Sequence, residues 1–306
     1  MTEPSLTTLI DIGDEIQGHE KWNAFVDGKN GFFYGIPSNA RRVVKFNPLD
    51  KSLTEIGPDL GEGYGKWACG VLANTGDIYC APCDAKHILK IKTSDGTVET
   101  LDNVELPETG DFLWATGAIA ADTCIYYMPF SARKIMRLNP DNDSLSSVGD
   151  DLGQGEFKYS GTVVGKDDRV FGIPDRSKRI IKFDPNNPDI ASTVVGEEAT
   201  EWFGCNNGVL GDGYIYAANR YGQVLKVDAT SNNHTLIGNP IYSGSGIGWG
   251  RPTIVADKCI YWHPHEANRT HKFNTNTQIP SLVGDGLGEG PAKWNDGALA
   301  TNGFKY

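Results

Sequence analysis

The sequence predicts an all-β protein built from about seven copies of one short unit. Three observations support this prediction: a tryptophan returns at a nearly constant interval, each interval contains four short apolar or alternating runs, and no interval contains a run with helical periodicity. The chain has 306 residues, among them 37 glycines and 16 prolines, which suits many short strands separated by turns. Its length is ample for a sizeable core.

The repeated unit is clearest in the stretch from Lys66 to Pro82, and variants of it recur along the chain. Successive repeat tryptophans are separated by 45, 47, 135 and 45 residues, and 135 is three periods of 45. These tryptophans are Trp22, Trp67, Trp114, Trp249 and Trp294. In the long gap, Tyr159 and the segment 202–205 take the tryptophan's place. We therefore expect seven repeats, starting near residues 22, 67, 114, 159, 205, 249 and 294.

Each repeat is expected to contain four strands with recognisable ends. The second strand closes on a proline in most repeats, as in Ile78–Pro82, because proline cannot donate a hydrogen bond to a continuing ladder. The third strand carries a basic residue at its third position, as Lys90 in Ile88–Ile91. The strand period of two predicts that this basic residue faces water.

Four antiparallel strands repeated every 45 residues are typical of the blades of a β-propeller, which pack radially around a channel. On these residues the sequence resembles the β-propeller superfamily over essentially its whole length. The repeat is similar to those of NHL-repeat, gluconolactonase-like and virginiamycin-B-lyase-like propellers, and it has neither the Trp-Asp dipeptide of the WD type nor the Gly-Gly pair of the kelch type. The resemblance implies a single propeller domain over residues 1–306, with seven blades, or alternatively six.

The two ends of the chain are expected to complete the seventh blade together. Residues 294–306 match the first two strands of a repeat, and residues 1–18 contain a match to a fourth strand in Leu6–Gly13. Pairing both ends in one sheet would close the ring and remove exposed strand edges. Nothing in either segment corresponds to the third strand, so either this blade has only three strands or the chain is part of a longer repeat array.

Charge and composition exclude several kinds of partner. A formal charge of -11 and a pI near 5.0 argue against general binding to nucleic acid or to an anionic membrane. No run of eighteen apolar residues and no secretion signal is visible, so we expect a soluble, cytoplasmic monomer. The pair Cys80 and Cys83 has no second pair or histidine at metal-binding spacing, so we interpret it as structural. No cofactor is predicted, and a divalent metal in the channel is left open.

The resemblance implies that two sets of loops share one face: the loops joining the second strand to the third, and those joining the fourth strand to the next blade. Each of the six former loops contains a basic residue, whereas acidic residues gather in the latter. Such charges form either a solvated rim or the contacts of an anionic or polyhydroxylated ligand. The repeat tryptophans likewise either wedge between blades or stack against a ligand.

The candidate ligand-binding residues are repeat tryptophans and polar residues near them: Asn23, Trp67, Trp114, Asn206, Asn207, Trp249, Arg251, Trp294 and Asp296. His263 and His265 are the candidates for a general acid or base, as in lyase-like propellers.

Two functions fit. The first is a non-enzymatic binding or scaffold propeller that holds a protein segment or a polar, carbohydrate-like ligand at its loop-rich face. The second is a hydrolase or lyase acting at the channel mouth, with or without a metal. One asymmetric polar pocket favours the enzyme, and a broad face of equivalent loops favours the scaffold.

Overall fold

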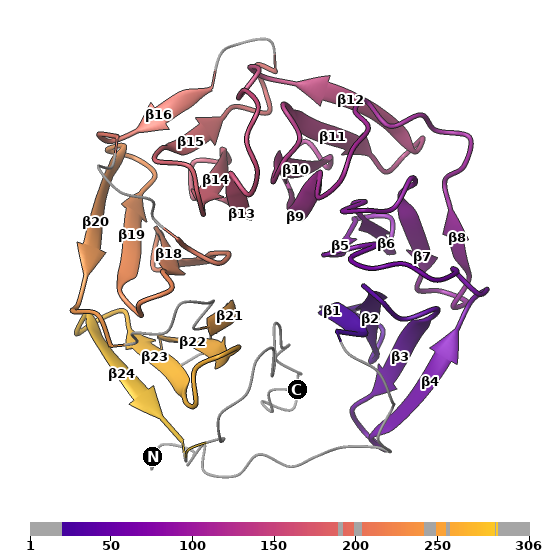
Figure 1. Ribbon diagram of the computed structural model, residues 1–306, viewed down its shortest axis with the longest axis horizontal. Helices are drawn as coiled ribbons and strands as arrows, with labels where there is room; N and C mark the ends of the chain where they lie inside the picture. Colours follow the sequence, from indigo (N-terminus) through magenta and orange to yellow (C-terminus); the bar gives the residue numbers. More distant parts are fainter. Residues whose placement is uncertain are drawn as a thin grey trace.

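The computed structural model describes residues 20–188, 192–198, 204–241, 249–254, 258–284 and 286. The described residues form six four-stranded antiparallel sheets arranged around a common axis (Figure 1). Within each sheet the strands follow chain order, with the first strand nearest the axis and the fourth at the perimeter. The prediction of a β-propeller is therefore confirmed.

The strand bounds are as follows. The first two blades are β1 to β4 (Trp22–Asp27, Phe33–Pro37, Val43–Asn47, Ser52–Ile56) and β5 to β8 (Val71–Leu72, Asp77–Cys80, Leu89–Lys92, Val98–Thr100). The third and fourth are β9 to β12 (Trp114–Ile119, Ile125–Pro129, Ile135–Asn139, Ser144–Val148) and β13 to β16 (Tyr159–Val164, Val170–Pro174, Ile180–Phe183, Thr193–Val195). The fifth and sixth are β17 to β20 (Val209–Gly211, Tyr214–Ala218, Val224–Asp228, Asn233–Ile237) and β21 to β24 (Trp249–Ile254, Cys259–Pro264, Thr270–Asn274, Ile279–Val283).

The expected number of seven blades is not supported, because the described strands form six, the number given as the alternative. The seventh blade was to be built from residues 1–18 and 294–306, and these segments lie outside the described residues. The other six repeat starts each pair with the end of the second strand of the same blade. These pairs are Trp22 with Pro37, Trp67 with Pro82, Trp114 with Pro129, Tyr159 with Pro174, Cys205 with Asn219, and Trp249 with Pro264.

The repeat tryptophans wedge between blades. Trp114 is fully buried and packs with Tyr79 and Ala81 of the preceding blade as well as with Tyr127 of its own. The indole of each described repeat tryptophan also donates its Nε1–H to a backbone carbonyl twenty residues further on, at 2.9 to 3.2 Å. The acceptors are the carbonyls of Arg42, His87, Lys134 and Arg269. The ring thus fills the blade interface while its polar group ties the first strand to the start of the third.

The basic residue of the third strand is buried in the second blade, contrary to the expectation from strand periodicity, and is partly exposed in the other five. Lys90 is only 9% exposed, and its Nζ contacts the carboxylate of Asp143 in the next blade at 2.9 Å. In five blades the ammonium group lies over an aromatic ring, 3.7 to 5.8 Å from the centroid: Lys45 over Phe32, Lys90 over Tyr79, Lys182 over Phe171, Lys226 over Tyr214, and Lys272 over Tyr261. Lys90 and Lys182 also contact the next blade, through Asp143 and Asn232, because both faces of a propeller sheet are covered.

All six cysteines are buried thiols without disulfides, in agreement with the structural interpretation of Cys80 and Cys83. Burial raises the pKa of the Cys83 thiol to about 12, so it stays protonated and unreactive at neutral pH. Within the described ranges, no three histidine, cysteine or acidic side chains gather closely enough to hold a metal ion. The same ranges contain no helix long and apolar enough to cross a membrane.

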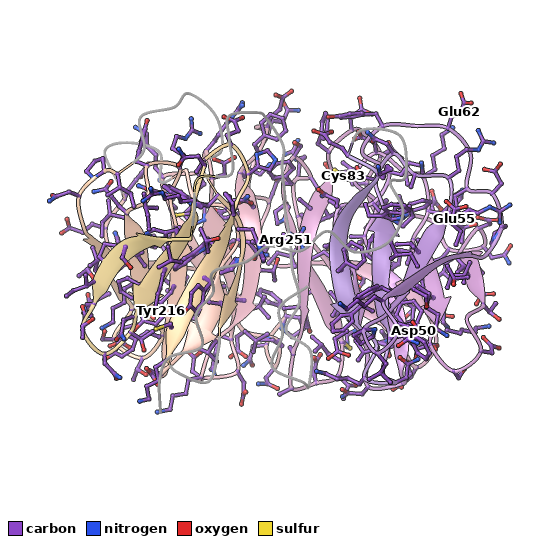
Figure 2. The ribbon with its side chains drawn as sticks, turned by 90° about the horizontal axis from the view of Figure 1, so that it is seen from below. Asp50, Glu55, Glu62, Cys83, Tyr216 and Arg251 are labelled. Atoms are coloured by element: carbon purple, nitrogen blue, oxygen red, sulfur yellow. The ribbon has the colours of Figure 1, made fainter. Side chains whose placement is uncertain are left out.

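The two loop sets lie on one face, as the resemblance implied. Figure 2 shows the propeller from the side, with Glu62, which precedes the second blade, and Cys83, which follows β6, towards one face. Asp50, in the turn between β3 and β4, lies towards the other. We call the face with Glu62 and Cys83 the loop face.

Candidate functional site

The first strand of several blades carries a β-bulge directly after its repeat aromatic residue, and the bulge turns polar groups toward the neighbouring blade. Asn23 donates its Nδ2–H to the carbonyl of Ala68 at 3.0 Å, and Asn206 donates to the carbonyl of Trp249 at 3.2 Å. Ser160 donates its hydroxyl to the carbonyl of Cys205 at 2.5 Å. These side chains, two of which were predicted to bind ligand, therefore help to hold adjacent blades together.

Arg251 crosses the axis of the propeller. From β21 of the sixth blade, its Nη2 donates to the carbonyls of Ala68 and Ala115, at 2.8 and 3.2 Å, in the second and third blades. Figure 2 places this side chain centrally, between the two halves of the ring. Because its acceptors here are backbone carbonyls on the far side of the axis, Arg251 acts as a brace across the centre.

A cavity of about 330 Å³ opens on the loop face, where the loops of the third, fourth and fifth blades meet the start of the sixth. It is lined by Phe130, Phe157, Ser160, Asp175, Arg176, Gly204, Cys205, Asn206, Asn219, Arg220 and Trp249. The lining combines aromatic rings, two guanidinium groups, one carboxylate and two amides. This irregular set belongs to one side of the ring only, so the cavity is asymmetric.

Two hydrogen bonds hold the backbone of Asp175, whereas its side-chain carboxylate accepts none from the described residues. Its N–H donates to the carbonyl of Lys158 at 3.0 Å, and its carbonyl accepts from the N–H of Gly204 at 2.9 Å. Within the described part of the chain, its carboxylate accepts no hydrogen bond. Arg220 Nη2 is 3.7 Å from its Oδ1, which is an ion pair but too long for a hydrogen bond.

The electrostatics of Asp175 follow from this placement. Burial raises its pKa to about 6, although the neighbouring charges of Arg220 and Arg176 lower it in part. A half-buried carboxylate with an elevated pKa and an unsatisfied hydrogen-bonding capacity, inside a cavity, is typical of binding and catalytic sites. Asp175 is the strongest such candidate among the described residues.

The loops around the cavity share a left-handed turn. One residue shortly before each first strand has a positive φ, and its carbonyl accepts a hydrogen bond from the backbone N–H of the loop that follows the second strand. We call it the left-handed position. Its residues and φ values are Glu20 (47°), Gly65 (63°), Phe112 (53°), Phe157 (58°) and Gly204 (62°). Glycine adopts a positive φ without steric strain, whereas phenylalanine adopts it only with strain.

The two arginines of the cavity are held in different ways. The guanidinium carbon of Arg176 lies 4.3 Å from the ring centroid of Phe157. The Arg220 side chain occupies the space that a side chain at residue 204 would need. A Cβ added to Gly204 would lie 2.9 Å from Arg220 Nε. Within the described ranges, the Arg220 guanidinium makes no hydrogen bond, so its donors remain available.

Other charges of the loop face form a solvated rim, one of the two interpretations given above. Arg133 pairs with Asp151 and Arg179 with Glu198, in exposed positions that repeat from blade to blade. Repetition and exposure both indicate a general surface feature, not a binding site.

The structure brings together only some of the predicted site residues. Asn206 and Trp249 line the cavity. Asn23, Trp67, Trp114, Asn207 and Arg251 are not part of its lining, and neither are His263, at the end of β22, and His265, in the following loop. Trp294 and Asp296 lie outside the described residues.

Sequence reasoning missed Asp175, Arg176, Arg220, Phe130 and Phe157 as individuals, although it named the loops that carry four of them. The residue directly after the second strand carried a sequence signal that could have pointed to Asp175. This position holds Ser38, Cys83, Phe130 and Asp175 in the first four blades, and the carboxylate departs most from the others.

The comparisons with known proteins concern the fold. No protein-family model matches the chain, and no curated protein matches its sequence. Among solved structures, the chain is similar to virginiamycin B lyase from Staphylococcus aureus, with a TM-score of 0.72 and 15% identity over 87% of this chain and 84% of that chain. It is also similar to a streptogramin B lyase (TM-score 0.72, 14% identity, 93% and 89% covered) and to hydrazine synthase from Kuenenia stuttgartiensis (0.62, 10%, 86% and 81%).

These identities are low, so the likeness shows the architecture alone. The resemblance to virginiamycin-B-lyase-like propellers that the repeat suggested is confirmed at that level. By its sheets and by these neighbours, the chain has the fold of the β-propeller superfamily.

Proposed function

We propose that this protein is a ligand-binding propeller whose cavity on the loop face takes a polyhydroxylated, carbohydrate-like ligand. The observation that supports this most directly is the pair Asp175 and Arg220, which lines the cavity without hydrogen bonds at either side chain within the described residues. A hydroxyl group both donates and accepts, so neighbouring hydroxyls of one ligand would satisfy the carboxylate and the guanidinium together.

The walls of the cavity suit the same kind of ligand. Phe130 and Phe157, with ring centroids 4.8 Å apart, offer apolar surface beside the polar pair. A sugar ring has an apolar face of C–H groups and a polar edge, which corresponds to this combination. The asymmetric cavity argues against a scaffold that uses its whole loop face equally, and it supports the enzymatic candidate below as well as a ligand-binding site.

The test measures the binding of neutral mono- and disaccharides to the protein by saturation-transfer NMR and by calorimetry. Asp175→Asn should weaken binding at least about tenfold, because a carboxylate hydrogen bond to a hydroxyl is a strong, charge-assisted one. Arg133→Gln, in the solvated rim, is the matched control and should leave binding unchanged. Equal binding by wild type and Asp175→Asn, or no binding of any sugar, would contradict the proposal.

A hydrolase or lyase acting at the same cavity is the second candidate, and the pKa of Asp175 near 6 is the observation that favours it. A carboxylate with this pKa is mostly ionised at pH 7 and could accept a proton from a bound substrate. The fold neighbours include virginiamycin B lyase, in one structure with quinupristin.

This second candidate predicts turnover. We would incubate the protein with quinupristin and with each bound saccharide and follow product formation by NMR. An enzyme should show a pH–rate limb near 6 that disappears in Asp175→Asn, whereas a binding protein should leave every ligand unchanged.

A further inference from the structure

Aromatic residues are rare in the loops that join the second strand of a blade to the third. All six of these loops lie in the described part of the chain, and together they contain one phenylalanine, one tyrosine and no tryptophan. The phenylalanine is Phe130, which lines the cavity. The tyrosine is Tyr221, which directly follows the cavity residue Arg220. Both aromatic residues therefore lie at the same cavity, although they come from different blades.

Tyr221 is exposed in a loop that is otherwise tightly held. Asn219, which lines the cavity and is 5% exposed, accepts hydrogen bonds at its Oδ1 from the backbone N–H groups of Tyr221 and Gln223, at 3.0 and 2.9 Å. Its Nδ2 donates to Gln223 Oε1 at 3.1 Å. Tyr221 itself is nevertheless 43% exposed. A rigid loop that presents an aromatic ring to solvent loses little conformational freedom when a ligand covers the ring.

The same loop packs onto the residues that lead into the sixth blade, beside the cavity. Gly222 has a φ of 82°, and a Cβ added there would collide with Ile241 Cγ1 and lie 2.9 Å from Trp249 Cη2. Ile241 donates its N–H to the carbonyl of Tyr221 at 2.8 Å and is 40% exposed. Because Trp249 lines the cavity, Tyr221 and Ile241 extend its wall outward as an apolar rim.

The size of the cavity gives this rim a use. A volume of about 330 Å³ is near the lower limit for ligand cavities, which span roughly 300–1,000 Å³. A ligand with two or more sugar rings would therefore extend past the cavity. On the side of Arg220 and Trp249, it would meet the exposed surface of Tyr221 and Ile241.

We propose that Tyr221 is a stacking platform for a second sugar ring, so that the preferred ligand of this protein is an oligosaccharide and not a monosaccharide. The first ring occupies the cavity at Asp175 and Arg220, and the apolar C–H face of the next ring lies on the Tyr221 ring. Tyrosine suits this role because it offers a large flat surface with only two side-chain torsions to fix. The inference rests on the proposed binding of polyhydroxylated ligands and narrows it by ligand length.

The experiment compares the dissociation constants of glucose, maltose and cellobiose by calorimetry. The two disaccharides join their rings through different linkages, so they direct the second ring differently. The wild-type protein should bind at least one of them about fivefold more tightly than glucose. Tyr221→Ala should bring the ratio of the two constants close to one, whereas Tyr221→Phe should preserve it, because stacking needs the ring and not the hydroxyl. Asp175→Asn should weaken the binding of glucose and disaccharide alike and leave the ratio unchanged.

Tyr64 provides a matched control on the loop face. It is 62% exposed, and its hydroxyl donates to Glu20 Oε2 at 2.5 Å. Both residues belong to loops of the first two blades, which do not line the cavity. Tyr64→Ala should therefore leave the ratio of the disaccharide and glucose constants as it is in the wild type.

Equal affinity for glucose and both disaccharides in the wild type would overturn the oligosaccharide inference and leave the proposed function standing. A preference for the disaccharide that survives in Tyr221→Ala would do the same. Binding of no mono- or disaccharide would overturn both.

Discussion

Cys83 in the second blade and Asp175 in the fourth occupy the same backbone position with opposite consequences. Each donates its N–H to a lysine carbonyl at 3.0 Å and accepts one from the residue that precedes the next blade. The thiol of Cys83 is 5% exposed and its burial costs little, whereas the half-buried carboxylate of Asp175 loses part of a hydration that only partners can replace. The repeat thus supplies a common frame, and the chemistry resides in side chains that depart from it.

The left-handed position gives the same lesson. Gly65 adopts its positive φ without strain. Phe157 adopts a similar φ with strain, and its ring lies against the Arg176 guanidinium at the cavity. A propeller can therefore specialise one side of its loop face while the blade geometry stays unchanged. Four predictions test this division between frame and cavity.

The largest effect is expected at the frame. Trp114→Ala should lower the free energy of unfolding by about 3–5 kcal/mol, because a fully buried ring and an indole hydrogen bond at a blade interface are both lost. Denaturant unfolding measures this, with Phe130→Ala at the half-buried cavity wall as the comparison. A smaller loss for Trp114→Ala than for Phe130→Ala would reverse the assignment of frame and cavity.

His271 tests the frame of the sixth blade. It is fully buried between Trp249 and Trp262, at centroid distances of 5.1 and 5.0 Å, and burial lowers its pKa from 6.5 to about 4. The unfolded chain therefore takes up the proton first. Stability is complete above pH 6.5 and falls as the pH drops toward 4, by about 3 kcal/mol from this residue.

His271→Leu should remove that dependence, since Leu89 and Leu225 occupy the same strand position in other blades. The difference in unfolding free energy between variant and wild type, measured from pH 7 to pH 4, gives the contribution directly. A pH-independent difference would show that His271 is not buried in its neutral form.

Asp175 should behave in the opposite sense. Its folded pKa of about 6 lies above its usual value of 3.8, so ionisation destabilises the native state. Its contribution to stability is therefore greatest at low pH and is lost as the pH rises through 6. At pH 8, Asp175→Asn should stabilise the protein by about 2 kcal/mol, and the gain should vanish below pH 4.

Placing the same carboxylate in the second blade sharpens this prediction. Cys83→Asp should destabilise the protein at pH 8 by more than Asp175→Asn stabilises it, because the residue that corresponds to Arg220 there is Ser131, which carries no charge. Equal and opposite effects would mean that Arg220 does not stabilise the Asp175 carboxylate.

The smallest change in stability is expected at Phe157. Phe157→Gly relieves the strain of a left-handed φ, worth about 1 kcal/mol, and removes the packing of a half-buried ring, which is of similar size and opposite sign. The unfolding free energy should therefore change by less than about 1 kcal/mol, while Gly65→Ala should cost more. A large loss for Phe157→Gly would assign this ring to the frame and not to the cavity.

Much of the fold could be predicted, because it depends on patterns that every blade repeats. The spacing of Trp22, Trp67 and Trp114 marked the blades, and the terminal prolines marked the ends of the second strands. The fourth strands β8 and β16 are hard to recognise in the sequence, since each is only three residues long and has little pattern. The outward-facing prediction for Lys90 was wrong, because strand periodicity says which face a residue occupies but not what covers that face.

The candidate site was predictable only as a set of loops. Asn206 and Trp249, which were predicted to bind ligand, line the cavity, whereas His263 and His265 are not part of its lining. Which loops meet depends on blade order around the ring, and the repeat pattern alone does not rank one loop above another. Arg251, which was predicted to bind ligand, donates to the carbonyls of Ala68 and Ala115 across the centre of the ring.

By itself, the sequence determined the repeated frame: the strand order within a blade, the buried tryptophans and the prolines that end strands, because these are local and occur several times. Only the tertiary structure decided that Asp175, Arg176 and Arg220 share one cavity while Arg133 and Arg179 belong to a solvated rim. The physical reason is that burial and the distance between charges are set by how neighbouring blades pack. Residues of the same type in the same repeated loop therefore acquire different energies and different chemistry.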